Sequence, residues 1–276
     1  MYNFVNKFLL FLKDNILTKI VLFVFTTIGK SAIMFNSSVG RFSLFFYKII
    51  VSVFHKQFFF KNFLNSLFVN GFCSIPVVGL TGFFIGAVLT LQLFTSLKMF
   101  GIENTIPYVV LVALMKELSP IMTGVMVISR VGSSMAAEIG TMNANNQIDV
   151  LTSMSINKYR YLYIPRIISM TIVQPILTTI SIIAGVIGSF AVSTSMFGFT
   201  ESYFYNLIYD GFDFSAYLVS IVKGLVFGFI ISLISCYKGN KTKNGAYGVK
   251  NTTISSVVVC CVYILIFNFV ITWAMC

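Results

Sequence analysis

Long apolar segments separated by short polar ones dominate this chain. No charged residue occurs from Phe72 to Leu97 or from Thr252 to Trp273, and three more apolar segments of similar length cover Ile106–Ser129, Tyr161–Thr200 and Phe214–Tyr237. Each segment is long enough to cross the ~30 Å hydrocarbon core of a bilayer as a helix. Because a helix satisfies its own backbone hydrogen bonds in lipid, the pattern predicts an all-α integral membrane protein with about five transmembrane helices.

Glycine and proline mark features inside these segments. Gly82 with Gly86, and Gly224 with Gly228, form small-xxx-small faces, which predict close helix packing. Pro175 lies inside the third segment, where a bend is expected.

The composition agrees with a membrane protein. Of 276 residues, 57% are hydrophobic and only 10% are charged, whereas soluble domains have about 25% charged residues. The net charge of +11 comes from basic residues that flank the apolar segments, so it indicates contact with anionic headgroups rather than nucleic acid. The five cysteines have no CxxC spacing and are interpreted as small packing residues, not as disulfides or metal ligands.

The N-terminal region, residues 1–61, is apolar but carries lysines and arginines throughout, opposed only by Asp14. A helix over Ile16–Phe35 lying in the cytoplasmic membrane interface fits this pattern. A signal peptide is a competing interpretation, disfavoured because no small-residue cleavage site follows. A membrane-crossing stretch at Ile16–Ile28 is a second competitor, but it is short. We therefore divide the chain into this interfacial region and a transmembrane domain, residues 62–276.

The connections between the apolar segments predict the orientation. Basic residues dominate segments 130–166 and 237–251, whereas Glu201, Asp210 and Asp213 lie in the connection between the third and fourth apolar segments. The positive-inside rule places both basic segments and the N-terminus in the cytoplasm, and the C-terminus on the opposite, periplasmic side.

The sequence lacks the motifs that several kinds of catalysis and ligand binding require. It contains no GxxxxGK[ST] loop, no HExxH motif and a single histidine, His55, so neither ATP binding of that kind nor a metal site is predicted. A GxSxG elbow and a pair of intramembrane aspartates are also missing. We expect no catalytic residues, metal or cofactor, and the hypothesis of an intramembrane enzyme is disfavoured.

Three ionisable residues fall at membrane depth. Lys116 and Glu117 lie about ten residues into the second apolar segment, and Lys223 has a similar depth in the fourth. Each costs on the order of 2.5–3.5 kcal/mol at mid-span, so such residues are candidates for function. A structural ion pair, or a lysine that snorkels to the interface, is the alternative. Polar groups beside an apolar cavity suit an amphiphile such as a phospholipid.

A polar insert, Thr141–Lys158, separates the second and third apolar segments. Residues Asn143–Leu151 predict a short cytoplasmic helix, capped by Asn145 or Asn146. Ile148, Leu151 and Met154 would form its apolar stripe, with Asn145, Asn146 and Asp149 on the other face. The helix could lie on the bilayer or dock a cytoplasmic partner.

Several ordered blocks from Lys116 onward resemble one known family. The blocks are Lys116-Glu117-Leu118-Ser119-Pro120, Arg130-Val131-Gly132-Ser133, Ala137-Glu138-Ile139-Gly140-Thr141-Met142, Asn146-Gln147-Ile148-Asp149-Val150-Leu151, Pro165-Arg166, Tyr237-Lys238-Gly239-Asn240, Gly245-Ala246-Tyr247-Gly248-Val249 and Thr252-Thr253. Together they resemble the MlaE/YrbE permeases of lipid ABC transporters that work with MCE-domain proteins, over roughly Leu67 to the C-terminus.

The resemblance implies a homodimeric permease of the inner membrane of Gram-negative-type bacteria. It implies transport of phospholipid between the inner and outer membranes, which maintains outer-membrane lipid asymmetry. The implied partners are a cytoplasmic ABC ATPase, a periplasmic MCE-domain lipid-binding protein and, in some systems, a small STAS-domain protein. A membrane scaffold that anchors these partners without carrying lipid is the competing hypothesis.

The resemblance also assigns roles to particular residues. Asn146, Gln147, Asp149 and Leu151 fall on the coupling helix that docks the ATPase, and Lys116, Glu117 and Lys223 fall near the lipid pocket. The chain departs from the family pattern at Asn146, where Glu is usual, and at Asn268, where Asp is common. Lys116 and Ser119 stand where Arg and Gly are frequent.

Overall fold

The computed structural model describes residues 16–53, 60–242 and 245–275. Every regular element in these ranges is helical, which confirms the predicted all-α class. The contacts divide the chain into two compact units, one ending at Ile50 and the other beginning at Val51.

The first unit consists mainly of helix α2, Ile16–Val53. Its 38 residues make it far longer than the predicted Ile16–Phe35 helix, because neither Gly29 nor Gly40 interrupts it. The basic side chains Lys30, Arg41 and Lys48 are exposed along it. Residues 1–15 and 54–59 of the predicted interfacial region lie outside the described residues, and its place at the membrane surface stays a prediction.

The second unit contains the membrane-spanning helices. In the described residues, five helical stretches are long and apolar enough to cross a bilayer, as predicted. They are Phe60–Lys98, Ile106–Ala144, Tyr159–Phe197, Phe214–Gly239 and Gly245–Met275. The first span consists of α3 (Phe60–Asn70), η1 (Phe72–Ser74) and α4 (Ile75–Lys98), and the second of α5 (Ile106–Ala113), η3 (Leu114–Leu118), α6 (Ser119–Val127), η4 (Ile128–Gly132) and α7 (Ser133–Ala144). The third span consists of η5 (Tyr159–Tyr163) and α9 (Ile164–Phe197). The fourth is α11 (Phe214–Gly239) and the fifth is α12 (Gly245–Met275). The connections contain η2 (Glu103–Thr105), α8 (Gln147–Ser153) and α10 (Glu201–Gly211).

The first span starts twelve residues before the predicted Phe72. Helix α3 carries polar side chains that lower its hydropathy, but two of them bond to the third span. Asn62 Nδ2 donates to the Tyr161 carbonyl at 3.4 Å, and Asn70 Nδ2 donates to Ser169 Oγ at 3.2 Å. These hydrogen bonds compensate for burying the polar side chains of α3. Its polarity is the reason that the sequence predicts a later start for the first span.

Three π-helical turns interrupt the spans, namely η3, η4 and η5. Pro120 and Pro165 each follow such a turn by two residues, and proline can neither donate to nor fit against the carbonyl four residues earlier. Each turn also carries charged residues, with Lys116 and Glu117 in η3, Arg130 in η4 and Arg160 in η5. Turns of this kind are frequent at functional sites.

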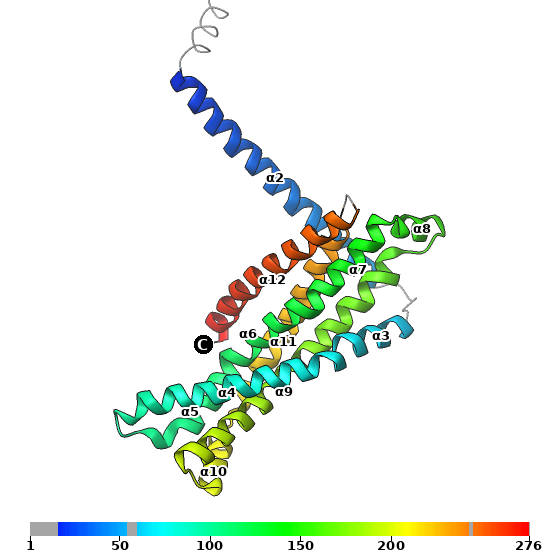
Figure 1. Cartoon of the computed structure of the whole chain (residues 1–276). Coiled ribbons are helices and arrows are strands. Elements are labelled where there is room, and N and C mark those ends of the chain that lie inside the picture. The colour runs from blue at the N-terminus through cyan, green and yellow to red at the C-terminus, as the bar shows by residue number, and fades with distance from the viewer. Residues whose placement is uncertain (1–15, 54–59, 243–244, 276) are drawn as a thin grey trace, which may run out of the picture. The chain divides into compact units, whose positions relative to one another are not determined.

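Helix α9 is the centre of the bundle, packed between α4 and α11 (Figure 1). A Cβ added at Gly86 would overlap the Gly185 backbone, and one at Gly224 would lie 2.9 Å from Pro175 Cα. The predicted close packing at both glycine faces is therefore confirmed. Helix α9 continues through Pro175 to Phe197.

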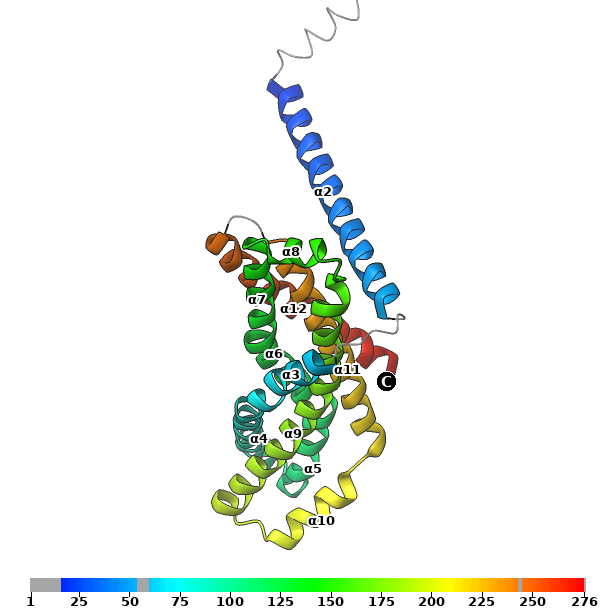
Figure 2. The same cartoon turned by 90° about the vertical axis from the view of Figure 1, so that its right-hand side faces the viewer.

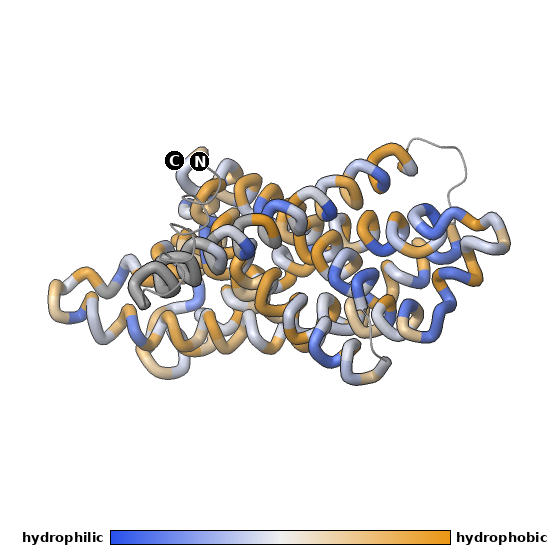
Figure 3. Tube along the Cα trace, turned by 90° about the horizontal axis from the view of Figure 1, so that it is seen from above, coloured by the Kyte–Doolittle hydropathy of each residue, from blue (hydrophilic) through white to orange (hydrophobic). Residues whose placement is uncertain are grey.

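The connections gather at two opposite ends of the bundle. Helix α8 lies at one end and α10 at the other in both side views (Figures 1 and 2). Asn143, just before α8, bonds to Asn240, after the fourth span, while Tyr203 of α10 bonds to the Asn104 carbonyl. Apolar residues dominate the middle of the bundle and polar residues are frequent near α8 (Figure 3). The two groups of connections thus lie at separate ends, as charge alternation predicted; which end is cytoplasmic stays a prediction.

Candidate functional site

Glu117 and Lys223 form an ion pair inside the bundle. The π-helical turn η3 presents Glu117, and α11 presents Lys223, so that Nζ lies 2.9 Å from Oε1. The Lys223 side chain is fully buried, whereas that of Glu117 is 35% exposed. The sequence nominated both residues, and the structure brings them together.

The Lys223 ammonium has an acceptor for each of its three N–H groups. Besides Glu117, it donates to the Lys116 carbonyl at 2.7 Å and to Thr272 Oγ1 at 2.8 Å. A buried charge is tolerated when it is paired and fully hydrogen-bonded. The pair therefore joins the second, fourth and fifth spans at one point.

Asn268 and Thr272 of α12 complete this polar cluster. Asn268 Nδ2 donates to Glu117 Oε2 and Thr272 Oγ1 to Glu117 Oε1, both at 2.8 Å. Asn268 Oδ1 is buried and has no donor within the described residues. Sequence reasoning did not assign these two residues to the site. The available signal was their i, i+4 spacing, which puts both on one face of an otherwise apolar span.

Lys116 enters the cluster only through its backbone. Its side chain is exposed and forms no salt bridge within the described residues. Its charge acts weakly on Asp213, at the start of α11. The structure therefore separates Lys116 from the ion pair that its neighbour makes, and leaves its ammonium on the surface of the second span.

The predicted coupling segment forms a helix with different bounds. Helix α7 continues through Asn143 to Ala144, and α8 begins at Gln147. Asn146 occupies the N-cap position, but its backbone is left-handed, with φ of 56°, and its side chain makes no capping hydrogen bond. The prediction of a side-chain cap is wrong because Asn146 serves the turn as a residue that tolerates left-handed backbone.

The faces of α8 differ partly from the predicted stripe. Ile148 is buried and Leu151 half-buried, but Met154 lies beyond the helix and is 66% exposed. Asn145, Asn146 and Asp149 are exposed, as predicted for the other face, and Gln147 is exposed as well.

An apolar groove of about 340 Å³ lies beside α8. Residues of α7, α8 and η5 line it: Met142, Gln147, Val150, Leu151, Tyr161 and Leu162. Two of the predicted coupling residues, Gln147 and Leu151, therefore share one surface with the start of the third span.

Asn143 ties the insert to the fourth span. Its Nδ2 donates to the Asn240 carbonyl at 3.2 Å and to the Thr242 carbonyl at 2.8 Å. Close by, a Cβ on Gly239 would lie 2.8 Å from Ile139 Cβ, so α7 and α11 are in tight contact. These contacts join the segment before α8 to α11, the helix that carries Lys223.

Five apolar spans, an ion pair inside their bundle and a short helix with an apolar groove at one end define the molecule as a multi-pass, all-α membrane protein. The chain belongs to the MlaE permease family, because the family model described as Permease MlaE matches residues 63–274.

Relatives in several organisms carry the same class of name. The chain is 40% identical to a "Probable ABC transporter permease protein" of Rickettsia bellii over 246 residues, which cover 89% of this chain and 95% of that one. It is 34% identical to a protein of the same description from Synechocystis over 215 residues, covering 78% and 82%. A third, from Pyropia yezoensis, is 33% identical with the same coverage. The chain is thus an ABC transporter permease, and ATP hydrolysis belongs to a separate cytoplasmic subunit.

Proposed function

We propose that this permease moves phospholipids between the inner and outer membranes of a bacterial envelope and so maintains outer-membrane lipid asymmetry. Membership of the MlaE family supports the proposal. The chemistry of the polar cluster supports it as well, since the cluster places charge at membrane depth inside an apolar bundle.

The exposed Lys116 beside the buried ion pair is the observation that carries the proposal. Glu117 and Lys223 neutralise each other, whereas the Lys116 ammonium has no salt bridge within the described residues. A lipid phosphate would give that ammonium a partner, with the acyl chains against the surrounding apolar surface. The partly exposed Glu117 would face the polar part of the same headgroup.

The proposed assembly is a homodimer with its ATPase, a periplasmic MCE-domain protein and, in some systems, a STAS-domain protein. From Ile254 onward the outer face of α12 is apolar, with Phe269 72% and Trp273 78% exposed. Lipid or a second copy would cover such a face. The bundle end with α8 is proposed to face the cytoplasm, and the C-terminus the periplasm.

Coupling to the ATPase is assigned to Asn146, Gln147, Asp149 and Leu151. Asn146, Gln147 and Asp149 are exposed at the end of the bundle with α8, and Leu151 lines the groove. ATPase closure would displace α8, and the Asn143 bonds would pass this displacement to α11.

Lipid transfer by reconstituted vesicles tests the transport role. With the ATPase and the MCE-domain protein present, Lys116→Ala should reduce transfer of a fluorescent phospholipid by roughly tenfold, equivalent to ~1.4 kcal/mol. Lys116→Arg should restore it. Lys98→Ala, an exposed lysine at the far end of the first span, is the matched control. Unchanged transfer by Lys116→Ala would reject the role.

A photocrosslinker at Ala113, which is partly exposed three residues before Lys116, separates transporter from scaffold and leaves the Lys116 ammonium in place. A transporter yields a phospholipid adduct that increases during ATP turnover. A scaffold assembles the same complex but yields no adduct, and Lys116→Ala leaves the distribution of lipid between vesicles unchanged.

Co-purification tests the coupling role. Gln147→Ala with Asp149→Ala should reduce the ATPase recovered with the permease, whereas Tyr209→Ala on α10, at the opposite end, should not. Full recovery together with normal transport would contradict the assignment.

A further inference from the structure

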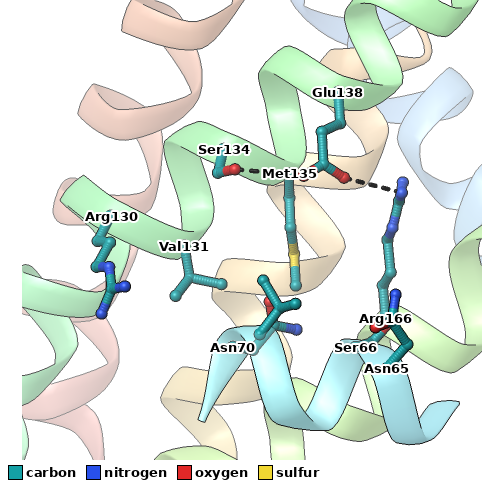
Figure 4. A pocket seen from close by; sticks show the side chains of 10 residues that line it. Asn65, Ser66, Asn70, Arg130, Val131, Ser134, Met135, Glu138 and Arg166 are labelled. Carbon is teal, nitrogen blue, oxygen red and sulfur yellow. Dashed lines mark hydrogen bonds and ion pairs between the residues drawn. The ribbon is translucent and has the colours of Figure 1, made fainter. Parts of the chain in front are cut away.

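A polar cavity, separate from the Glu117 cluster, lies between α3, the η4–α7 segment and the start of α9. Its volume is about 210 Å³. Its polar and charged lining residues are Asn65, Ser66, Asn70, Arg130, Ser134, Glu138 and Arg166, and its apolar ones are Val69, Val131 and Met135. Figure 4 shows Arg130 at one side of this cavity and the Glu138–Arg166 pair at the other, with Met135 between them.

The charges around the cavity are only partly matched. Arg166 Nη2 lies 2.9 Å from Glu138 Oε2, and Ser134 Oγ donates to Glu138 Oε1 at 3.4 Å. Glu138 is thus occupied by Arg166 and Ser134. The Arg130 guanidinium forms no ion pair within the described residues, so the cavity retains one unmatched positive charge.

Arg166 adds an unused donor to the same cavity. Its Nη1 is buried and has no hydrogen-bond partner within the described residues. A buried donor on a charged group is costly when it lacks an acceptor. An anion in this cavity would lie between two guanidinium groups, with Arg130 at one side and Arg166 at the other, and guanidinium groups suit the geometry of phosphate oxygens.

The cavity lies near the end of the bundle with α8. The second span has 39 residues, about 58 Å of helix, which is nearly twice the ~30 Å hydrocarbon core. Its last turns therefore extend past the core, and Glu138 lies only about 9 Å from their end at Ala144. Phosphate groups of lipids and dissolved phosphate are both available at that level.

We propose that this cavity binds a phosphate group through Arg130 and Arg166, with Glu138 competing for Arg166. Its volume admits a phosphate with part of a headgroup, given about 30 Å³ for each water-sized group. The site is independent of the transport route assigned to Lys116, since it shares no residue with the Glu117 cluster.

Two substitutions should change phosphate binding in opposite directions. Arg130→Gln should weaken it by about tenfold, and the variant should fold because Arg130 has no ion pair to lose. Glu138→Gln should strengthen it, because Arg166 is then released from its carboxylate. If this cavity had a purely structural role, Glu138→Gln would not increase phosphate binding. Lys98→Gln, at the far end of the first span, is the control.

Thermal stabilisation of the full chain in detergent measures this binding, since a ligand specific to the folded state raises Tm. The probes are inorganic phosphate and dihexanoyl-phosphatidylglycerol, with dihexanoylglycerol as the phosphate-free control. Stabilisation by both phosphate probes, or by the lipid alone, supports the site and identifies a lipid source when Arg130→Gln weakens it, because the Lys116 route does not depend on Arg130. Stabilisation by inorganic phosphate alone supports the site with a free anion as ligand.

The proposal is overturned if neither phosphate probe raises Tm, or if Arg130→Gln and Glu138→Gln leave the shifts unchanged. Loss of ATPase recovery in Arg130→Gln without any phosphate response would also overturn it, since a protein contact would then occupy the cavity.

Discussion

Lys223 Nζ lies 2.9 Å from Glu117 Oε1, and this contact joins the second and fourth spans through two residues that are 106 positions apart in sequence. The two members have unequal surroundings, because Lys223 is fully buried while Glu117 is one-third exposed. A structural pair and a functional one make different demands on these residues. A structural pair requires only neutrality, whereas a lipid route also requires the nearby Lys116 charge.

Substituting Glu117 and Lys223 one at a time should show that their unequal burial gives unequal losses of stability. Glu117→Gln leaves the buried ammonium with only neutral acceptors and should lower the free energy of unfolding by roughly 3 kcal/mol. Lys223→Met should cost less, about 1–2 kcal/mol, because Glu117 keeps its bonds from Asn268 and Thr272. Chemical unfolding in detergent measures both values.

The double variant Glu117→Gln with Lys223→Met is the control for the pair. It should be more stable than Glu117→Gln alone, since no buried charge remains. Equal destabilisation by the two single substitutions, with additive effects in the double variant, would show that the pair is not coupled.

Gly86 should tolerate no side chain. A Cβ there would overlap the Gly185 backbone, which cannot move aside as a flexible side chain could. Gly86→Ala should therefore destabilise the α4–α9 contact by about 3 kcal/mol, the upper end of overpacking costs. Gly79→Ala, on the same helix with nothing within 4 Å of the added Cβ, is the control and should retain the wild-type Tm. Equal Tm values for the two variants would contradict the close approach.

Asn143 should act as a link rather than a contact for partners. Asn143→Ala removes both bonds to the Asn240 and Thr242 carbonyls and should cost roughly 1 kcal/mol per bond. Asn143→Asp should cost more, because a carboxylate would then face two carbonyls. In reconstituted vesicles, Asn143→Ala should retain ATPase binding but lose lipid transfer per ATP hydrolysed. Asn145→Ala, an exposed neighbour, should change neither quantity.

Much of the fold follows from the sequence because a span is a cumulative signal over about 20 residues. The start of the first span could not be predicted, since the polar residues of α3 are compensated by bonds to the third span, such as Asn70 to Ser169. Glu117 and Lys223 could be nominated from their depth, but their pairing depends on helix packing. The sequence predicts a capping side chain at Asn145 or Asn146, and only the backbone angle of Asn146 shows that this residue serves a turn.

The cavity at Arg130 likewise could not be predicted from the sequence. Arg130, Glu138 and Arg166 belong to two spans and are separated along the chain, so the sequence shows three charges but not which of them meet. Only the packing of α3 against α9 encloses them. Ionisable residues can thus be found from sequence more readily than the sites they form.

Asp213 should make the stability of α11 depend on pH. It is the N-cap, and its carboxylate accepts from Ser215 Oγ at 2.6 Å and from Ser215 N at 2.9 Å. These bonds, with a smaller contribution from the positive charge of Lys116, lower the pKa of Asp213 below its ordinary value. The ionised form is thus favoured in the folded state, so its stabilisation is present above the unfolded pKa of ~3.9 and is lost as pH falls through the lower folded pKa.

The comparison of wild type with Asp213→Ala tests this dependence. The Tm difference should be full at about pH 6, shrink below about pH 4 and vanish in stronger acid. Asp213→Asn keeps a capping side chain that does not titrate, so its Tm advantage over Asp213→Ala should persist across the same range. A wild-type advantage that is constant with pH would show that the ionised carboxylate does not stabilise the start of α11.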